Sequence, residues 1–114
     1  MNDKEIRKVL ISWLQASSSE IRIYQEKSIG TSICDLMAVT DCLTGYEIKS
    51  DLDNYQRLDR QIKNYDRVFD KNYIVIGQQH HATIEKRLPL HWGIIVITND
   101  HVNITRKAQY GTLP

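Results

Sequence analysis

The 114-residue sequence has only two cysteines, no long apolar run and almost no net charge. Cys34 and Cys42 match neither a zinc knuckle nor a CxxC redox pair, so we expect two reduced, buried thiols and no disulfide. The longest apolar run, residues 93–97, is far shorter than the ~20 residues of a membrane-spanning helix. The first residues do not form a signal peptide, and we therefore expect a cytoplasmic protein.

Motifs of several enzyme classes are also missing. The sequence contains no glycine-rich phosphate loop and no nucleophile elbow, and its four histidines show no zinc-ligand spacing with the cysteines. It has no repeat, low-complexity tract or linker, so residues 1–114 are expected to form a single domain. Because 15 Lys and Arg nearly balance 14 Asp and Glu, any contact with nucleic acid has to come from local clustering of basic residues.

The hydrophobic pattern predicts alternating helices and strands. Apolar residues recur at helical spacing over about residues 3–15, and again from Asp53, which forms a capping-box pattern with Gln56, to about residue 69. A short helix over 82–88 is stopped by Pro89. Strands are predicted at 21–24, 33–39, 46–49, 73–76, 93–98 and 102–105. This order indicates the α/β class, a central mixed β-sheet flanked by helices with a C-terminal helix and β-hairpin.

Three charged residues occur where burial should disfavour them. Asp35 lies inside the apolar segment 33–39, which we expect to be a central strand covered on both faces. Glu47 and Lys49 are two apart on the next strand, so their side chains share one face. If the two strands pair through the turn at 41–45, Asp35 lies beside Glu47 and Lys49.

A divalent cation explains these residues better than a salt bridge. Neighbouring carboxylates repel each other, and the oxygens of Asp35 and Glu47 suit Mg²⁺ or Mn²⁺, with the backbone carbonyl of Ile48 as one more ligand. Such a cation can polarise a phosphoryl oxygen and acidify a bound water, while Lys49 orients that water or stabilises charge on the phosphate. The pattern predicts hydrolysis of a phosphodiester.

The second long helix adds polar residues to this arrangement. Gln61 interrupts the apolar stripe and shares a face with Tyr65, four residues later. Basic residues occupy other positions of the helix, where they can meet phosphates: Arg57, Arg60, Lys63 and Arg67.

The order of Asp35, then Glu47-Ile48-Lys49, then residues 61–65 resembles the PD-(D/E)xK nuclease superfamily, which has the restriction-endonuclease-like fold. Together with residues 45–51 and 91–93, it looks like one small bacterial and phage branch of unassigned role. The resemblance spans nearly the whole chain, although Cys34 stands where the name motif has proline.

The resemblance implies an αβββαβ core, metal ligation by Asp35 and Glu47, and a catalytic role for Lys49. The further residues that it assigns to substrate contact, site bracing or outer metal ligation are Gln61, Tyr65, Arg57 and Glu26. The expected function is that of a Mg²⁺-dependent nuclease, an endonuclease-like hydrolase acting on DNA.

Other interpretations of the same residues stay open. Glu47 and Lys49 can form an ordinary salt bridge on an edge strand, and Asp35 can bond a local backbone group. Gln61 and Tyr65 can be a satisfied core pair. The alternative function is a nucleic-acid-binding or scaffold subunit that does not cleave, in a repair, phage or defence system. A homodimer or a larger complex is compatible with either function.

Overall fold

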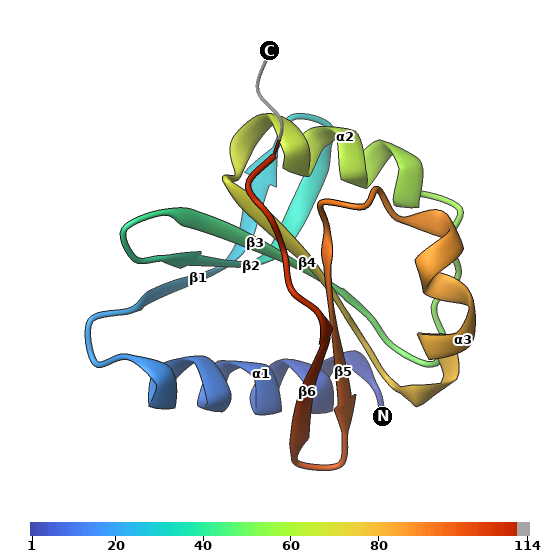
Figure 1. Cartoon of the computed structure of the whole chain (residues 1–114), viewed down its shortest axis with the longest axis horizontal. Helices are drawn as coiled ribbons and strands as arrows, with labels where there is room; N and C mark the ends of the chain where they lie inside the picture. The colour runs from blue at the N-terminus through green and yellow to red at the C-terminus, as the bar shows by residue number, and fades with distance from the viewer. Residues whose placement is uncertain (112–114) are drawn as a thin grey trace.

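The computed structural model describes residues 1–111 (Figure 1). Its helices and strands follow the predicted order, and one 3-10 turn lies before the short third helix and one after it. The elements are α1 (Asp3–Ser17), β1 (Arg22–Ile29), β2 (Ser32–Val39), β3 (Leu43–Lys49), α2 (Leu58–Val68), β4 (Lys71–Ile76), the turn Gln78–His80, α3 (His81–Ile84), the turn Glu85–Arg87, β5 (Gly93–Thr98) and β6 (His101–Arg106).

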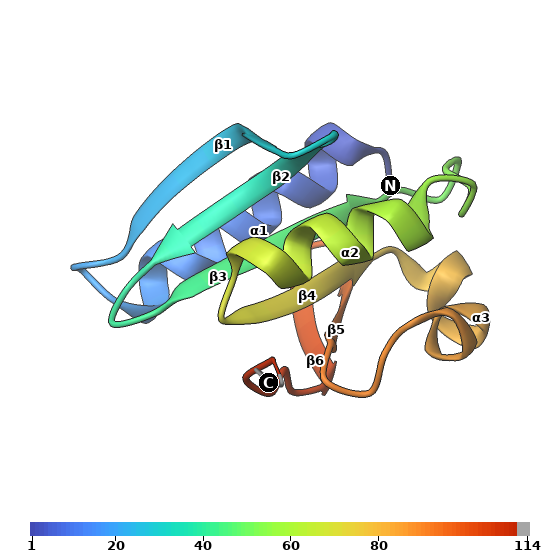
Figure 2. The same cartoon turned by 90° about the horizontal axis from the view of Figure 1, so that it is seen from above.

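The strands form one six-stranded sheet in chain order, from β1 to β6. The β3–β4 and β4–β5 pairs are parallel, and the β1–β2, β2–β3 and β5–β6 pairs are antiparallel. Helix α1 covers one face, and α2 with α3 covers the other (Figure 2). Each face has its own apolar cluster, one built with α1 and one built with α2 and α3. The predicted α/β class, a mixed sheet flanked by helices, is therefore confirmed.

Helix α1 confirms the helix predicted over residues 3–15 and extends it to Ser17. Its buried residues Ile6, Leu10 and Leu14 are four apart, which places them on one stripe against the sheet. A capping box starts the helix: the Asn2 side chain accepts a hydrogen bond from the backbone N–H of Glu5, and the Glu5 carboxylate accepts one from that of Asn2.

The start predicted for α2 is wrong. The helix begins at Leu58, and the Asp53 carboxylate instead accepts hydrogen bonds from the backbone N–H and the hydroxyl of Ser50, at 2.7 and 3.0 Å. The capping-box spacing of Asp53 and Gln56 is the reason for the error, because an Asp side chain bonds nearby backbone groups in turns as readily as at helix ends.

Other boundaries differ by a few residues. Strand β5 lies where it was predicted, and the hairpin to β6 turns at Asn99, whose φ is +57°. The predicted helix 82–88 is shorter, because only His81–Ile84 is α-helical. Cys34 is buried as expected, whereas Cys42 is only half-buried, and both thiols are free. No helix among the described residues is long and apolar enough to cross a membrane.

Strand β2 is less central than predicted. It is the second strand of the sheet, beside the edge strand β1, and Ile33 on it is 55% exposed. Its pairing with β3 ends at Leu36 opposite Tyr46. Beyond this last pair the two strands separate, and Asp35 and Glu47 are the first residues of the separated part. This fork in the sheet is the local feature that creates the candidate site.

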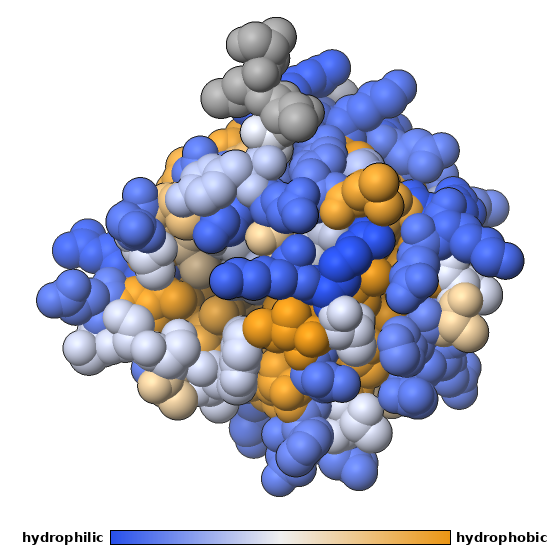
Figure 3. Space-filling model, viewed as in Figure 1, coloured by the Kyte–Doolittle hydropathy of each residue, from blue (hydrophilic) through white to orange (hydrophobic). Residues whose placement is uncertain are grey.

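In the view of Figure 1, polar side chains cover most of the rim and apolar side chains show in the middle of the face (Figure 3).

Candidate functional site

The fork between β2 and β3 brings the predicted acidic pair together. The Asp35 carboxylate takes the place of a strand partner, because its Oδ2 accepts a hydrogen bond from the backbone N–H of Ile48 at 2.9 Å. Glu47 lies on the adjoining part of β3, which pairs on its other side with β4. The expectation that Asp35 lies beside Glu47 and Lys49 therefore agrees with the geometry.

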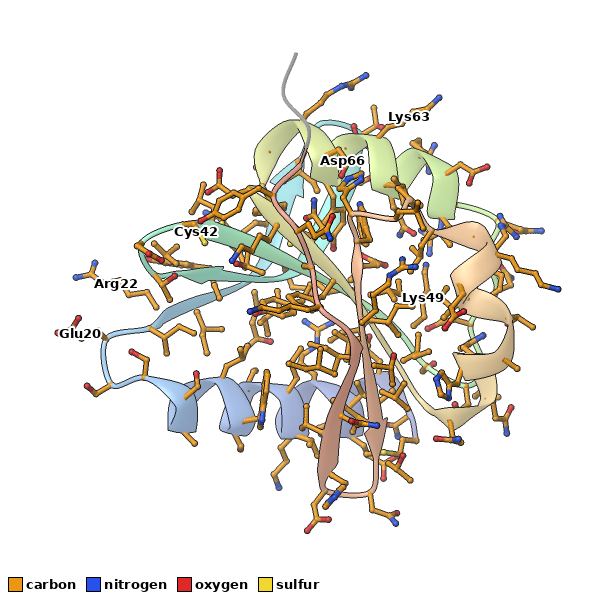
Figure 4. All side chains as sticks on the ribbon, viewed as in Figure 1. Glu20, Arg22, Cys42, Lys49, Lys63 and Asp66 are labelled. Atoms are coloured by element: carbon orange, nitrogen blue, oxygen red, sulfur yellow. The ribbon has the colours of Figure 1, made fainter. Side chains whose placement is uncertain are left out.

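Glu47 and Lys49 are buried in contact with each other. Their side chains are only 4% and 5% exposed, and Lys49 Nζ lies 3.4 Å from Glu47 Oε2. Because β3 is an interior strand, this pair is not the exposed edge-strand salt bridge that was considered as an alternative. Figure 4 shows Lys49 near the middle of the molecule, with Glu20 and Arg22 at its periphery.

Tyr65 of α2 closes the fork from above. Its hydroxyl donates to Glu47 Oε1 at 2.5 Å and accepts from the backbone N–H of Asp35 at 3.2 Å. The ring is fully buried, against Phe69 and Trp92. Tyr65 therefore links α2 to β2 and β3 by hydrogen bonds and positions the Glu47 carboxylate.

Arg7 of α1 approaches Asp35 from the other side of the fork. It lies 3.4 Å from Asp35 Oδ1, 3.0 Å from Glu26 Oε1 and 3.1 Å from Asp3 Oδ1. Glu26, considered as a further metal ligand, is thus ion-paired with Arg7. Its φ of +57° is a left-handed conformation that non-glycine residues rarely adopt.

The two central carboxyl groups both resist ionisation. Burial and, after it, the charge of Asp35 together raise the pKa of Glu47 to about 8, against the opposing effects of Tyr65 and Lys49. Burial also raises the pKa of Asp35, while the N–H of Ile48 and the charge of Arg7 lower it. Burial therefore favours the neutral form of both adjacent carboxyls, although Arg7 and Lys49 lie beside them.

Asp35, Glu47 and Lys49 line a polar cavity of about 340 Å³. Five acidic and three basic residues contribute to its wall, so the lining is acidic overall. The charged lining residues are Asp3, Glu26, Asp35, Glu47 and Asp53, and Lys49, Arg57 and Arg60.

Gln61 has a buried polar atom without a partner in the cavity wall. Its side chain lies in the wall, Gln61 is 8% exposed, and Oε1 has no hydrogen-bond partner. A buried acceptor without a donor is costly, typically about 1–3 kcal/mol. Gln61 and Tyr65 are therefore not the satisfied core pair considered above, because only Tyr65 is satisfied.

The structure brings together most of the predicted site residues. The predicted residues that line the cavity are Glu26, Asp35, Glu47, Ile48, Lys49, Arg57 and Gln61, whereas Tyr65 lies behind its wall, bonded to Glu47. Of the basic residues on α2, Arg60 lines the cavity, whereas Lys63 and Arg67 do not.

Sequence reasoning missed Arg7, Asp3 and Asp53. Arg7 has the largest role of the three, and only its position on the polar side of the α1 stripe hinted at it. Its partners Glu26 and Asp35 are 19 and 28 residues away, and no local spacing encodes that contact.

The donor set suits one kind of metal site. Among residues 1–111 no three His, Cys, Asp or Glu side chains converge to hold a metal on their own. Mg²⁺, however, is often held by one or two carboxylates together with waters and phosphate oxygens of a ligand. Asp35, Glu47 and the carbonyl of Ile48 fit that mode, and a cation there would favour the ionised form of both carboxyls.

Fold and site together define an α/β domain with an acidic cavity at a fork between two strands. The family described as Bacteriophage P4 protein cII matches residues 1–112, so the chain belongs to this family. A protein named Protein cII, from Enterobacteria phage P4, is 27% identical over 111 residues. That match covers 94% of this chain and 42% of the phage protein, so the chain spans less than half the length of this relative.

A solved structure shares the fold. SPO1766, a protein of unknown function from Silicibacter pomeroyi, superimposes with a TM-score of 0.76 at 17% sequence identity. The match covers 100% of this chain and 76% of that protein. At this identity the likeness shows the fold alone.

The family findings correct the sequence-based identification. The chain is not assigned to the PD-(D/E)xK nucleases, and neither relative is named as a nuclease or hydrolase. The predicted function, a metal-dependent endonuclease, is therefore wrong. The physical reason is that the spacing of these residues reflects only a local geometry, in which two strands separate beneath a helix. The residues are Asp35, Glu47, Lys49, Gln61 and Tyr65. Such a geometry does not identify a reaction.

Proposed function

We propose that this chain is a nucleic-acid-binding domain whose cavity holds a backbone phosphate of DNA through a divalent cation, Mg²⁺ or Mn²⁺. The observation that carries the proposal is the adjacent carboxyl pair, Asp35 and Glu47, in a cavity with arginines in its wall. Cleavage of the DNA is not part of this proposal, and an enzymatic activity stays a prediction from the sequence.

Charge explains why the cation is needed. The wall has five acidic and three basic residues, and Arg7 beside it pairs with three of the acidic ones, so no excess of positive charge is left for a bare phosphate. A divalent cation between Asp35 and Glu47 reverses the local charge and presents open coordination positions to phosphate oxygens. Arg57, just before α2, and Arg60, on α2, are both exposed and can then contact neighbouring phosphates.

Gln61 supports a ligand in the same place. Its buried Oε1 needs a donor, and a cation-bound water or an N–H group of a nucleotide supplies one. We also propose that the sheet and helices form a restriction-endonuclease-like core, because the order α1, β1, β2, β3, α2, β4 is the order expected of that fold. A dimer or a larger complex stays a prediction.

The test is binding of a fluorescently labelled DNA duplex, followed by anisotropy, in Mg²⁺ and in EDTA. We expect Glu47→Gln and Asp35→Asn each to weaken binding in Mg²⁺ about tenfold or more, which is about 1.4 kcal/mol or more. Glu20→Gln, at the periphery of the molecule, is the matched control and should bind like the wild type. Equal affinity in Mg²⁺ and EDTA, or no binding at all, would contradict the proposal.

A second pair of variants tests the basic residues. Arg57→Gln should weaken binding and reduce the salt dependence by about one counterion, whereas Arg22→Gln, the matched basic control on β1, should leave both unchanged. Equal effects of the two variants would show that binding follows overall charge and not this cavity.

A further inference from the structure

Arg7 is a cation already present at the edge of the site. Its side chain is 15% exposed, and the guanidinium reaches three carboxylates, on Asp3, Glu26 and Asp35. It also donates to the backbone carbonyl of Asp35, at 3.2 Å. Burial lowers the pKa of Arg7 but its acidic partners outweigh that effect and raise it, so the side chain stays charged at every ordinary pH.

The three contacts differ in length. The closest approaches of the guanidinium to Asp3 and Glu26 are 3.1 and 3.0 Å, whereas its contact with Asp35 is 3.4 Å. Asp3 is one turn before Arg7 on α1 and bonds it through both carboxylate oxygens. Arg7 can therefore lose its contact with Asp35 and remain held by the other two residues.

Glu26 is held at the site by the same residue. The register of the flanking pairs, Gln25 with Leu36 and Lys27 with Cys34, places Glu26 opposite Asp35 across the two strands. Its left-handed backbone is strained, and its carboxylate ends on Arg7. A third carboxylate thus lies beside the cavity, neutralised by an arginine.

We infer that Arg7 competes with the divalent cation for Asp35 and Glu26, and so weakens cation binding in the absence of a phosphate ligand. When Arg7 is bound to Asp35 and Glu26, these two carboxylates already have a positive partner and attract the divalent cation less. Tight binding then needs the additional oxygens of a phosphate, which couples cation binding to nucleic-acid binding. Because this role rests on the proposed function, its test measures the cation alone.

The experiment is titration of the folded protein with Mn²⁺ in the absence of nucleic acid, with free Mn²⁺ followed by electron paramagnetic resonance. We expect Arg7→Gln to bind Mn²⁺ about tenfold more tightly than the wild type, because it frees Asp35 and Glu26. Lys8→Gln removes the same charge from an exposed position of α1 and should change the affinity less than about twofold, because exposed charges are screened.

A double-mutant cycle assigns the effect to Glu26. Glu26→Gln should weaken Mn²⁺ binding by a smaller factor in the wild-type background, where Arg7 neutralises Glu26, than in the Arg7→Gln background, where it should remove a large part of the gain. Additive effects of the two substitutions would overturn the assignment to Glu26.

Two results would overturn the role of Arg7. If Arg7→Gln binds Mn²⁺ no more tightly than the wild type, Arg7 only positions Asp35, and the competition is refuted while the proposed function stands. If neither protein binds Mn²⁺ at millimolar concentration, the competition is likewise refuted, and the proposed function is decided separately by the duplex-binding assay in Mg²⁺ and EDTA. Should Arg7→Gln not fold by circular dichroism, Arg7→Lys decides: its compact ammonium cannot span three carboxylates, so it should bind Mn²⁺ more tightly than the wild type, and equal or weaker binding refutes the competition.

Discussion

The raised pKa of Glu47 predicts an unusual dependence of stability on pH. Burial and the neighbouring Asp35 raise this pKa from 4.5 to about 8 in the folded state. Between these two values the folded protein binds a proton at Glu47 that the unfolded chain releases. The contribution is therefore fully present below about pH 4.5 and is lost as the pH rises through about 8.

The size of the effect follows from the two pKa values. With 4.5 in the unfolded chain and about 8 in the folded protein, the contribution of Glu47 falls by about 4 kcal/mol between pH 5 and pH 9. That is a large part of the 5–15 kcal/mol that typically stabilises a domain.

The measurement is the free energy of unfolding in urea at pH 5, 6, 7, 8 and 9, for the wild type and for Glu47→Gln. The glutamine is neutral at every pH and keeps an acceptor for the Tyr65 hydroxyl, while groups that titrate elsewhere are common to both proteins. We expect the wild type to lose about 4 kcal/mol more than the variant over this range. The same slope in both proteins, or a wild type that gains stability relative to the variant as the pH rises, would refute the reasoning.

Three substitutions test other parts of the structure, each by urea unfolding at pH 7. Tyr65→Phe removes the hydroxyl that donates to Glu47 and should cost about 2 kcal/mol, and a cost below 0.5 kcal/mol would contradict a role for this hydrogen bond. Asn2→Ala removes the capping box of α1 and should cost about 1 kcal/mol, with an unchanged stability as the contrary result. Asp66→Ala leaves the indole N–H of Trp92 without its acceptor and should cost about 1–2 kcal/mol, and an effect no larger than that of an ordinary surface substitution would speak against it.

The fold could be predicted from the sequence because burial has a local period. Residues four apart on α1 face the sheet. The strand predicted over the apolar segment 93–98 has the same bounds in the structure, as β5. Helix α2 shows where local reasoning ends. Its start depends on whether Asp53 caps a helix or a turn, and the local sequence permits both.

The site could be predicted only where its residues are close in sequence. Glu47 and Lys49 share a face by strand geometry, and a short turn brings Asp35 back beside them. Arg7 could not be found in this way, because its contact with Asp35 depends on how α1 packs against the sheet. The family could not be deduced from these spacings either, since the same local geometry serves chains of different families.

Asp35 and Glu47 are proposed to hold a divalent cation that contacts a DNA phosphate. The most direct test of this proposal is a crystal structure of the protein with Mn²⁺ and a short DNA duplex, with data collected at a wavelength where manganese scatters anomalously. The proposal predicts an anomalous peak between the two carboxylates, with a phosphate oxygen of the DNA about 2.1–2.3 Å from it, close to the metal–oxygen distances of hard divalent cations. DNA bound in the crystal with no peak at these carboxylates, or with manganese elsewhere, would contradict it.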